Sequence, residues 1–124
     1  MPTAEHIEST VRRYLDLVAT GTADQIAALY ADDATVEDPV GGGEVHIGHH
    51  AIAGFYRNIE NLERATELLA LRVAGHEAAF MFAITIGSGE QRMRIQPIDV
   101  MVFNGDGTIA SMKAYWSAAD AGPV

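Results

Sequence analysis

Apolar residues in the first half of the chain recur every three to four positions, the spacing that gathers them on one face of a helix. A first helix is predicted to bury Ile7, Val11, Tyr14, Leu15 and Val18. Gly21 supplies a stop signal after it, and Thr22 with Gln25 makes a capping box that starts a second, short helix. The second helix is predicted to bury Ile26, Leu29 and Tyr30, and a third helix Ile52, Phe55, Tyr56, Ile59 and Leu62.

The rest of the chain shows the two-residue alternation of strands, interrupted by glycine-containing turns. Strands are predicted over residues 68–74, 78–86, 92–103 and 108–116. An earlier strand covers 34–38, where Val36 and Asp38 share a face and Pro39 keeps Asp38 extended. Because strands joined by short turns pair antiparallel, the four later strands should form a meander.

Helices grouped early and strands grouped late predict an α+β fold. A curved, mainly antiparallel sheet should wrap its concave face around the three N-terminal helices and form a cone with an open mouth. The strand over 92–103 is apolar on both faces, so one face should line a pocket and the other should meet helices or a second subunit, which favours a symmetric homodimer. The 124 residues suffice for a single domain, 1–124, with 117–124 as a loose tail.

Charge and composition narrow the classes of function. A formal net charge of -9 repels phosphate backbones and anionic lipids, so nucleic acid and membrane surfaces are not expected partners. Cysteine is absent, which excludes thiol nucleophiles and thiolate metal sites. The longest apolar run, 78–84, is too short to cross a bilayer. The first residues lack a basic start and an apolar core, so we expect no secretory signal and a cytoplasmic location.

Two aspartates occupy positions that should be buried. Asp38 lies on the inward face of its strand, and Asp99 interrupts an apolar run over 97–103. An ionised carboxylate is costly to bury, so the pKa of Asp99 is predicted to rise until the group stays protonated and donates a hydrogen bond. Asp38, less deeply placed, should remain ionised and act as a base. The alternative is that each aspartate bonds a backbone amide or faces solvent.

Three phenols and one polar loop are the other candidates for chemistry. Tyr14, Tyr30 and Tyr56 lie on inward faces, where their hydroxyls either bond carbonyl groups or bond one another in series. The loop containing Glu44, His46, His49 and His50 is interpreted as solvated rather than as a metal site, because zinc ligands need rigid support. The predicted core also includes residues of which some should line an apolar pocket: Met81, Met93, Met101, Met112, Phe80, Phe82 and Trp116.

The segment 30–39, with Tyr14 upstream and 97–99 downstream, closely resembles bacterial steroid Δ5-isomerases, also called ketosteroid isomerases. The resemblance continues through 54–57, 77–80, 103–105 and Met112, and covers about residues 3 to 116. It implies the cone-shaped fold shared by nuclear-transport-factor-2-like and SnoaL-like proteins, and a homodimer. It also implies an isomerase that needs no cofactor or metal and moves a carbon–carbon double bond into conjugation with the 3-ketone of a steroid.

The resemblance also assigns roles to individual residues. Asp38 matches the general base, while Tyr14 and Asp99 match two donors to the oxyanion of the intermediate. Tyr30 and Tyr56 match phenols that support Tyr14. The expected contacts with the steroid are Phe82, Met112 and Trp116. The loop 40–50 departs from the family pattern in its glycine and histidine content.

The same scaffold hosts other activities, so rival hypotheses stay open. A polyketide cyclase would need one acid–base group, and a limonene-type epoxide hydrolase would need an Asp-Arg-Asp arrangement that this sequence does not convincingly supply. A non-catalytic domain that binds small molecules or dimerises would not require Asp38 and Asp99 together. The placement of Asp99 within an apolar strand favours the isomerase.

Overall fold

The computed structural model describes residues 2–124. Helix α1 (Ala4–Thr20) begins at Thr3, whose hydroxyl accepts a hydrogen bond from the backbone N–H of His6, and it ends at Gly21. The predicted capping box of Thr22 and Gln25 is present and starts α2 (Ala23–Ala27), and the third helix is α3 (Gly48–Glu60). The strands are β1 (Tyr30–Glu37), β2 (Val45–Ile47), β3 (Arg64–Ala74), β4 (Glu77–Ile86), β5 (Met93–Ile95), β6 (Ile98–Phe103), β7 (Ile109–Tyr115) and β8 (Ala121–Pro123).

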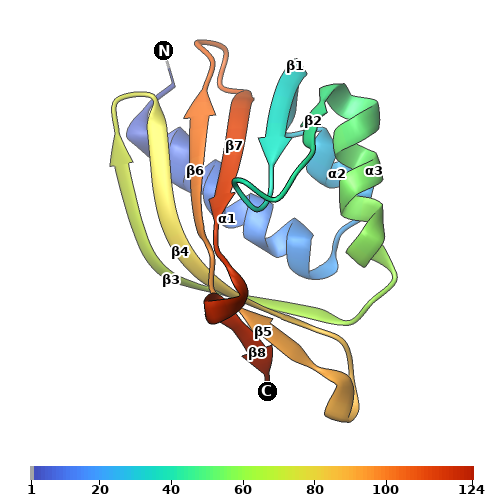
Figure 1. Ribbon diagram of the computed structural model, residues 1–124. Coiled ribbons are helices and arrows are strands. Elements are labelled where there is room, and N and C mark those ends of the chain that lie inside the picture. The colour runs from blue at the N-terminus through green and yellow to red at the C-terminus, as the bar shows by residue number, and fades with distance from the viewer. Residues whose placement is uncertain (1) are drawn as a thin grey trace.

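Over residues 2–124 these strands form one curved sheet in the order β2-β1-β7-β6-β4-β5-β8, with β3 pairing β4. The pairing of β1 with β7 is parallel, and the other strand pairs are antiparallel. The sheet curves around the helices, with α1 crossing behind the central strands and α3 standing beside β1 and β2 (Figure 1). The predicted α+β architecture is confirmed.

Two parallel rows of side chains cross the concave face of the sheet. Strand register places Ala78, Met101, Met112, Val36 and His46 in the first row. The four residues before His46 in this row are fully buried. The second row runs from Phe80 through Asp99 to Ala114, and all three of these side chains are also buried. These rows join the helices in the hydrophobic core and determine which side chains reach the site.

The structure differs from the predicted elements at several places. A short strand, β2, forms within the segment 40–50 that was predicted as a loop, and β3 begins at Arg64 instead of residue 68. Tyr30 begins β1 instead of ending the second helix, and its ring is buried in both arrangements, so apolar spacing alone could not distinguish them. The strand predicted over 92–103 is divided at Pro97, which lacks the N–H group needed for a ladder bond. The C-terminal residues expected as a loose tail form β8, where Ala121 pairs with Ile95.

The outer face of β6 is also less buried than the sequence indicated. Asp99, Met101 and Phe103 face the core, whereas Ile98 on the opposite face is 40% exposed in the single chain.

Within residues 2–124, no helix has the length and apolar character that a bilayer crossing requires.

The side chain of one arginine forms hydrogen bonds with the ends of two helices. Arg64, at the start of β3, donates hydrogen bonds to the carbonyl oxygens of Ala19 and Gly21 at the end of α1 and of Ile59 in the last turn of α3. The last carbonyls of a helix lack N–H partners one turn further along the chain, and a planar guanidinium can bond several of them at once. The Ile59 carbonyl also accepts from the backbone N–H of Leu62, just after α3. Arg64 therefore fixes the relative position of the two helices that carry Tyr14 and Tyr56.

Candidate active site

A hollow opens between α1, α3 and the concave face of the sheet. Most of its wall is apolar and includes Val18, Phe55, Ile59, Phe82, Ile84 and Ile95. The polar groups in the wall are Tyr14, Asp38, Tyr56, Asn58 and the indole of Trp116. An apolar cavity with a few convergent polar groups is the usual form of a small-molecule site.

Asp38 is held at the edge of this hollow by the pairing of β1 with β7. It is the first residue after β1, and the parallel register that pairs Glu37 with Lys113 brings it beside Ala114. The backbone N–H of Val40 then donates to the carbonyl of Ala114 at 2.8 Å and continues the pairing beyond Asp38. The carboxylate therefore stands on backbone that is fixed on both sides.

The indole of Trp116 donates a hydrogen bond from Nε1 to Oδ1 of Asp38 at 2.7 Å. Burial raises the pKa of Asp38 above the usual value, while the Trp116 hydrogen bond and the nearby charge of His46 each lower it. Asp38 is only partly buried. It is consequently a carboxylate of increased basicity that can still ionise, which suits a general base.

The second row on the concave face sets the separation of the two aspartates. Asp99 on β6 pairs with Ala114 on β7, and Asp38 follows on the far side of Ala114. Neighbouring strands lie about 4.8 Å apart, so the two acids are separated by about 10 Å of sheet. Both point toward the helices, with the small side chain of Ala114 between them.

Asp99 is 1% exposed, and neither of its carboxyl oxygens has a hydrogen-bond partner among residues 2–124. Burial raises the pKa of Asp99 well above its usual range, and the negative charge of Asp38 raises it further. A carboxyl group in such surroundings favours its protonated form. In that form Asp99 has an O–H donor that no other described residue uses.

The three phenols form one buried hydrogen-bonded chain. The hydroxyl of Tyr56 lies 2.9 Å from that of Tyr14 and 2.9 Å from that of Tyr30. Burial is the main cause that raises the pKa of all three well above the ordinary value, so they remain protonated. The ring of Tyr14 also packs edge-on against Phe80, the neighbour of Asp99 on β4, with ring centroids 6.3 Å apart.

The predicted site residues fall into two groups, those that line the hollow and those that are buried outside its wall. Tyr14, Asp38, Tyr56, Phe82 and Trp116 line the hollow. Asp99 and Tyr30 are buried outside its wall, with Asp99 in the same row as Asp38 and Tyr30 reached through Tyr56. Met112, expected to contact a ligand, belongs to the first row of the core instead and is fully buried outside the wall.

The polar loop does not gather its side chains into one cluster. The ring of His46 packs on Phe55, Nε2 of His49 lies 2.6 Å from the carbonyl oxygen of Tyr30, and His50 is exposed on α3. Throughout the described chain, residues 2–124, no group of three or more histidine, aspartate or glutamate side chains is arranged to hold a metal ion.

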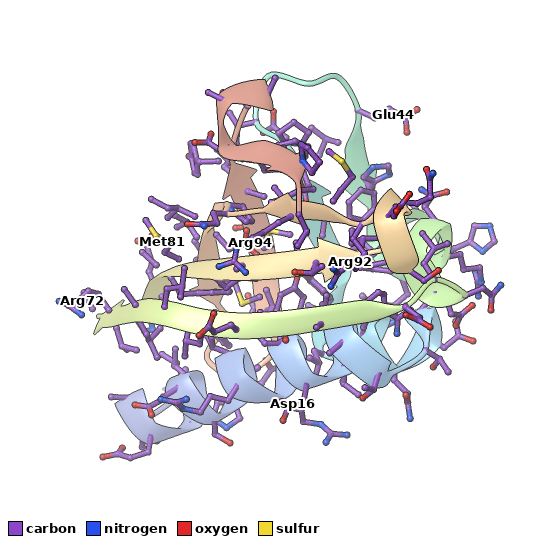
Figure 2. All side chains as sticks on the ribbon, turned by 90° about the horizontal axis from the view of Figure 1, so that it is seen from below. Asp16, Glu44, Arg72, Met81, Arg92 and Arg94 are labelled. Carbon is purple, nitrogen blue, oxygen red and sulfur yellow. The ribbon has the colours of Figure 1, made fainter. Side chains whose placement is uncertain are left out.

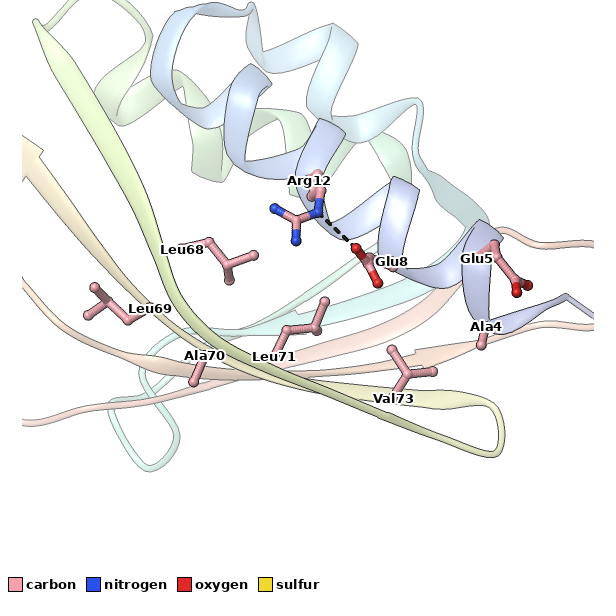
Figure 3. A pocket seen from close by; sticks show the side chains of 9 residues that line it. All are labelled: Ala4, Glu5, Glu8, Arg12, Leu68, Leu69, Ala70, Leu71 and Val73. Carbon is pink, nitrogen blue, oxygen red and sulfur yellow. Dashed lines mark hydrogen bonds and ion pairs between the residues drawn. The ribbon is translucent and has the colours of Figure 1, made fainter.

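A second hollow lies on another part of the molecule, between the first half of α1 and β3 (Figure 3). It is an open groove in which Glu5, Glu8 and Arg12 of α1 face leucines of β3, and Arg12 is paired with Glu8 at 3.1 Å. Its charged groups are solvated, and it contains neither of the two unusual aspartates. The chemistry points to the first hollow.

Comparison with known proteins agrees with this geometry. Residues 11–112 match the model of the SnoaL-like domain family. A protein named Steroid Delta-isomerase, from Nocardioides simplex, is 51% identical over 115 residues, which is 92% of each chain. The chain belongs to the steroid Delta-isomerase family.

Among solved structures, this isomerase-family chain is similar to SalBIII, described as an epoxide hydrolase/cyclase-like enzyme with a role in pyran ring formation in the polyether salinomycin. The TM-score is 0.81 at 26% identity, and the match covers 94% of this chain and 95% of the other. The cone-shaped fold predicted from the sequence is thus confirmed.

One functional contact of this family member was not predicted from the sequence. Trp116 was assigned to ligand binding, but its indole N–H is also bonded to Asp38. The two residues are 78 positions apart, and their contact depends on the parallel pairing of β1 with β7. No local sequence pattern predicts that pairing. The one clue in the sequence was that a buried indole N–H needs a hydrogen-bond acceptor, which indicated that Trp116 would have a polar partner.

Proposed function

We propose that this protein converts 3-oxo-Δ5-steroids into conjugated 3-oxo-Δ4-steroids, with Asp38 as the base and Tyr14 and Asp99 as the oxyanion donors. One observation carries the assignment: a fully buried acid without a hydrogen-bond partner in the described chain, Asp99, shares a row with a partly buried acid, Asp38. Burial raises the pKa of Asp99 well above its usual range and favours its protonated form. A core that needed only stability would not place two acids in this way, because each buried carboxyl costs free energy.

The reaction moves one proton and one carbon–carbon double bond. Asp38 removes a proton from the carbon that lies between the ketone and the isolated double bond. The electron pair of the broken C–H bond shifts toward the ketone and forms a dienolate, whose negative charge rests on the former ketone oxygen. Asp38 then returns the proton to the far carbon of the dienolate, which places the remaining double bond in conjugation with the restored ketone. The base ends in its original state.

In the proposed mechanism, Tyr14 and Asp99 stabilise the dienolate by donating hydrogen bonds to its oxygen. Donors held in place within an apolar site stabilise a developing oxyanion more strongly than water does, since they need no reorganisation. Tyr30 can donate to Tyr56, and Tyr56 to Tyr14, which leaves the Tyr14 proton for the ligand. Hydrogen bonds in series polarise one another, so the two outer phenols strengthen the donor at the end of the chain.

The lining of the hollow supports an apolar ligand. The volume of the hollow is about 190 Å³, below the roughly 300–1,000 Å³ of typical ligand sites. We therefore place the reacting end of the steroid against Tyr14 and Asp38, with Phe82 and Trp116 at its faces and the far rings extending across the exposed rim near Asn58.

The direct test is to add purified protein to 5-androstene-3,17-dione and follow the ultraviolet absorbance of the conjugated enone. We expect the absorbance to rise far faster than in buffer. A rate equal to the buffer rate at saturating steroid would reject the proposal for this substrate class.

Because the fold is similar to that of an epoxide hydrolase/cyclase-like enzyme, the main alternative to isomerisation is the reaction of an epoxide hydrolase or a cyclase. An Asp-Arg-Asp hydrolase site would need an arginine beside the aspartates, and among residues 2–124 no arginine lines the hollow. Asp99 also lacks the cationic partner that such a site would give it. The geometry accordingly favours proton transfer next to a ketone.

We also propose that the protein is a homodimer joined through the outer face of the sheet. Met81, Ile98 and Tyr115 pair side by side across β4, β6 and β7, and each is partly exposed in the single chain. A contiguous apolar stripe of this kind is typical of a subunit interface.

Replacing Ile98 by aspartate should convert the dimer into a monomer, because the charge would be buried without a partner at the interface. Sedimentation velocity of the wild type and the variant measures this directly. Leu62, which is 48% exposed in the turn after α3 and is not part of the sheet, provides the control: Leu62→Asp should leave the mass unchanged. A monomeric wild type would exclude the interface.

A further inference from the structure

We propose that Asn58 is a specificity-determining residue whose side-chain amide binds an oxygen, in a ketone or a hydroxyl group, at the end of the steroid skeleton farthest from the reacting ketone. The inference rests on the proposed isomerase function and names the kind of steroid that the site prefers. The polar side chains at the reacting end of the hollow already have roles in the proposed reaction, whereas Asn58 in the same wall has none.

The hollow has an inner end and an open end. Along β4 the side chains of Phe82, Ile84 and Ile86 line it in turn, and the first two are buried while Ile86 is partly exposed. The ring of Phe80 packs against those of Phe82 and Tyr14, with centroids 5.7 Å and 6.3 Å apart, so Tyr14 lies at the Phe82 end of the wall. The reacting ketone is therefore placed at the inner end, and the hollow opens toward Ile86.

Asn58 lies at the open end, on the last turn of α3. Arg64, which pairs with Ile86 across β3 and β4, donates a hydrogen bond at 2.7 Å to the carbonyl of Ile59. This bond brings the C-terminal end of α3 to the end of β4 at which the hollow opens. Asn58 directly precedes Ile59 in the wall, and it is exposed.

The distance between the two ends suits a steroid. Phe82 and Ile86 are four residues apart on one strand, which corresponds to about 13 Å. This length is comparable to that of four fused rings, so a steroid with its ketone beside Tyr14 extends its far end to the region of Asn58. The other residues near that end are apolar and include Val18, Ile59 and Ile95.

The charged residues next to Asn58 on α3 are engaged with α2. Arg57 donates from Nη2 to Oδ1 of Asp24 at 2.9 Å, and Oε1 of Glu60 accepts from the backbone N–H of Ala23 at 2.7 Å. These contacts hold the last turn of α3 against α2. They leave Asn58 as the residue of that turn whose polar side chain borders the hollow.

The arginines near the open end are also directed elsewhere. Arg92 donates from Nε to the carbonyl of Gly89, in the turn before β5, at 3.0 Å. Arg94 on β5 lies against β3, with Nη2 3.9 Å from Oε1 of Glu67 (Figure 2). The wall, as described over residues 2–124, therefore offers no cationic side chain to an anionic substituent. A neutral oxygen is what this end of the hollow can bind.

A carboxamide suits such an oxygen, because its NH2 group donates to a ketone and its carbonyl accepts from a hydroxyl. An oxygen that lost its water against the apolar wall would otherwise remain unpaired, at a cost in free energy. Asn58 is exposed and water competes with it, so we expect a contribution to binding of about three- to tenfold. The contact is remote from the reacting carbons and equal in the ground state and the transition state, so its effect falls on KM rather than on kcat.

Binding of two reaction products tests the inference without turnover. Trp116 is the only tryptophan in the sequence and lines the hollow, so its fluorescence reports ligands that bind there. The ligands are 4-androstene-3,17-dione and 4-androsten-3-one, which differ only in the far oxygen. We expect the ratio of their dissociation constants to shift about three- to tenfold against the dione in Asn58→Leu. An unchanged ratio would overturn the inference.

Asn61→Leu is the matched control, since Asn61 is an exposed asparagine just after α3 that is outside the wall of the hollow. It should keep the wild-type ratio. An equal shift in both variants would show that the helix end, and not the amide of Asn58, is responsible, and would contradict the inference. The proposed function fails separately: it is rejected when the wild type turns over no 3-oxo-Δ5-steroid, whereas the inference is rejected by product affinities alone.

Asn58→Asp should affect two substrates differently. A carboxylate accepts hydrogen bonds and cannot donate them, so KM for 5-androstene-3,17-dione should rise about three- to tenfold. KM for 17β-hydroxy-5-androsten-3-one, whose hydroxyl can donate, should rise much less. Steady-state measurement of enone absorbance gives both values. Equal changes for the two substrates, or a change confined to kcat, would count against the role of Asn58.

Discussion

Replacing Asp38 by asparagine is expected to lower kcat on a 3-oxo-Δ5-steroid by about a hundred- to ten-thousandfold, the usual contribution of a positioned proton carrier. Asparagine has nearly the same shape, and its amide oxygen can still accept the hydrogen bond from Trp116. It cannot take up the substrate proton. Stopped-flow or steady-state measurement of enone absorbance gives the rate.

Two further measurements separate this chemical effect from a loss of structure. Binding of a phenol, which imitates the dienolate at Tyr14 and Asp99, should persist in Asp38→Asn. Trp116→Phe, which removes the N–H donor and retains an aromatic ring, should slow turnover far less than Asp38→Asn. Wild-type activity in Asp38→Asn would show that another group moves the proton.

Replacing Asp99 by alanine should reduce kcat by about a hundred- to a thousandfold, the typical cost of losing one oxyanion donor. Asp99→Asn is the matched variant, because it keeps an N–H donor of similar size at the same position and should retain more activity than Asp99→Ala. Equal wild-type rates in both variants would mean that Asp99 does not reach the ligand oxygen.

The same substitution carries a prediction for stability. An unfolded aspartate loses its proton near pH 4, whereas burial holds the pKa of Asp99 in the folded protein well above that value. Between those two pH values the folded state binds the extra proton. The stabilising contribution of Asp99 is therefore full below about pH 4 and falls by roughly 1.4 kcal/mol per pH unit as the pH rises toward its folded pKa.

Asparagine does not titrate, so the wild type should lose stability relative to Asp99→Asn as the pH increases from about 4 to 7. Urea denaturation of both proteins across this range measures the difference, from which the contribution of Asp38, present in both, largely cancels. Free energies of unfolding that change in parallel would contradict a protonated Asp99.

The sequence was informative wherever one local pattern had one structural meaning. The apolar spacing around Tyr14 and the box of Thr22 and Gln25 predicted α1 and the start of α2, because caps and periodicity are local. Asp99 could be recognised as unusual from the apolar run around it. Its exposure of 1% agrees with that interpretation.

Features that depend on distant pairing were not predictable in this way. Tyr30 satisfies both a helix pattern and a strand pattern, and only its pairing with Ile109 places it in β1. The sequence of the C-terminal residues is typical of a loose tail, and they form a strand only because they pair with β5. Met112 carries no mark in the sequence that distinguishes the buried row from the wall of the hollow.

The mounting of both aspartates on one continuous sheet, separated by Ala114, has a consequence for how a ligand enters. Their spacing follows from the width of a strand and is already present in the free protein, so a ligand does not have to bring the two acids together. Association should then resemble the docking of two rigid bodies, and the free energy of binding is not diminished by assembly of the catalytic groups.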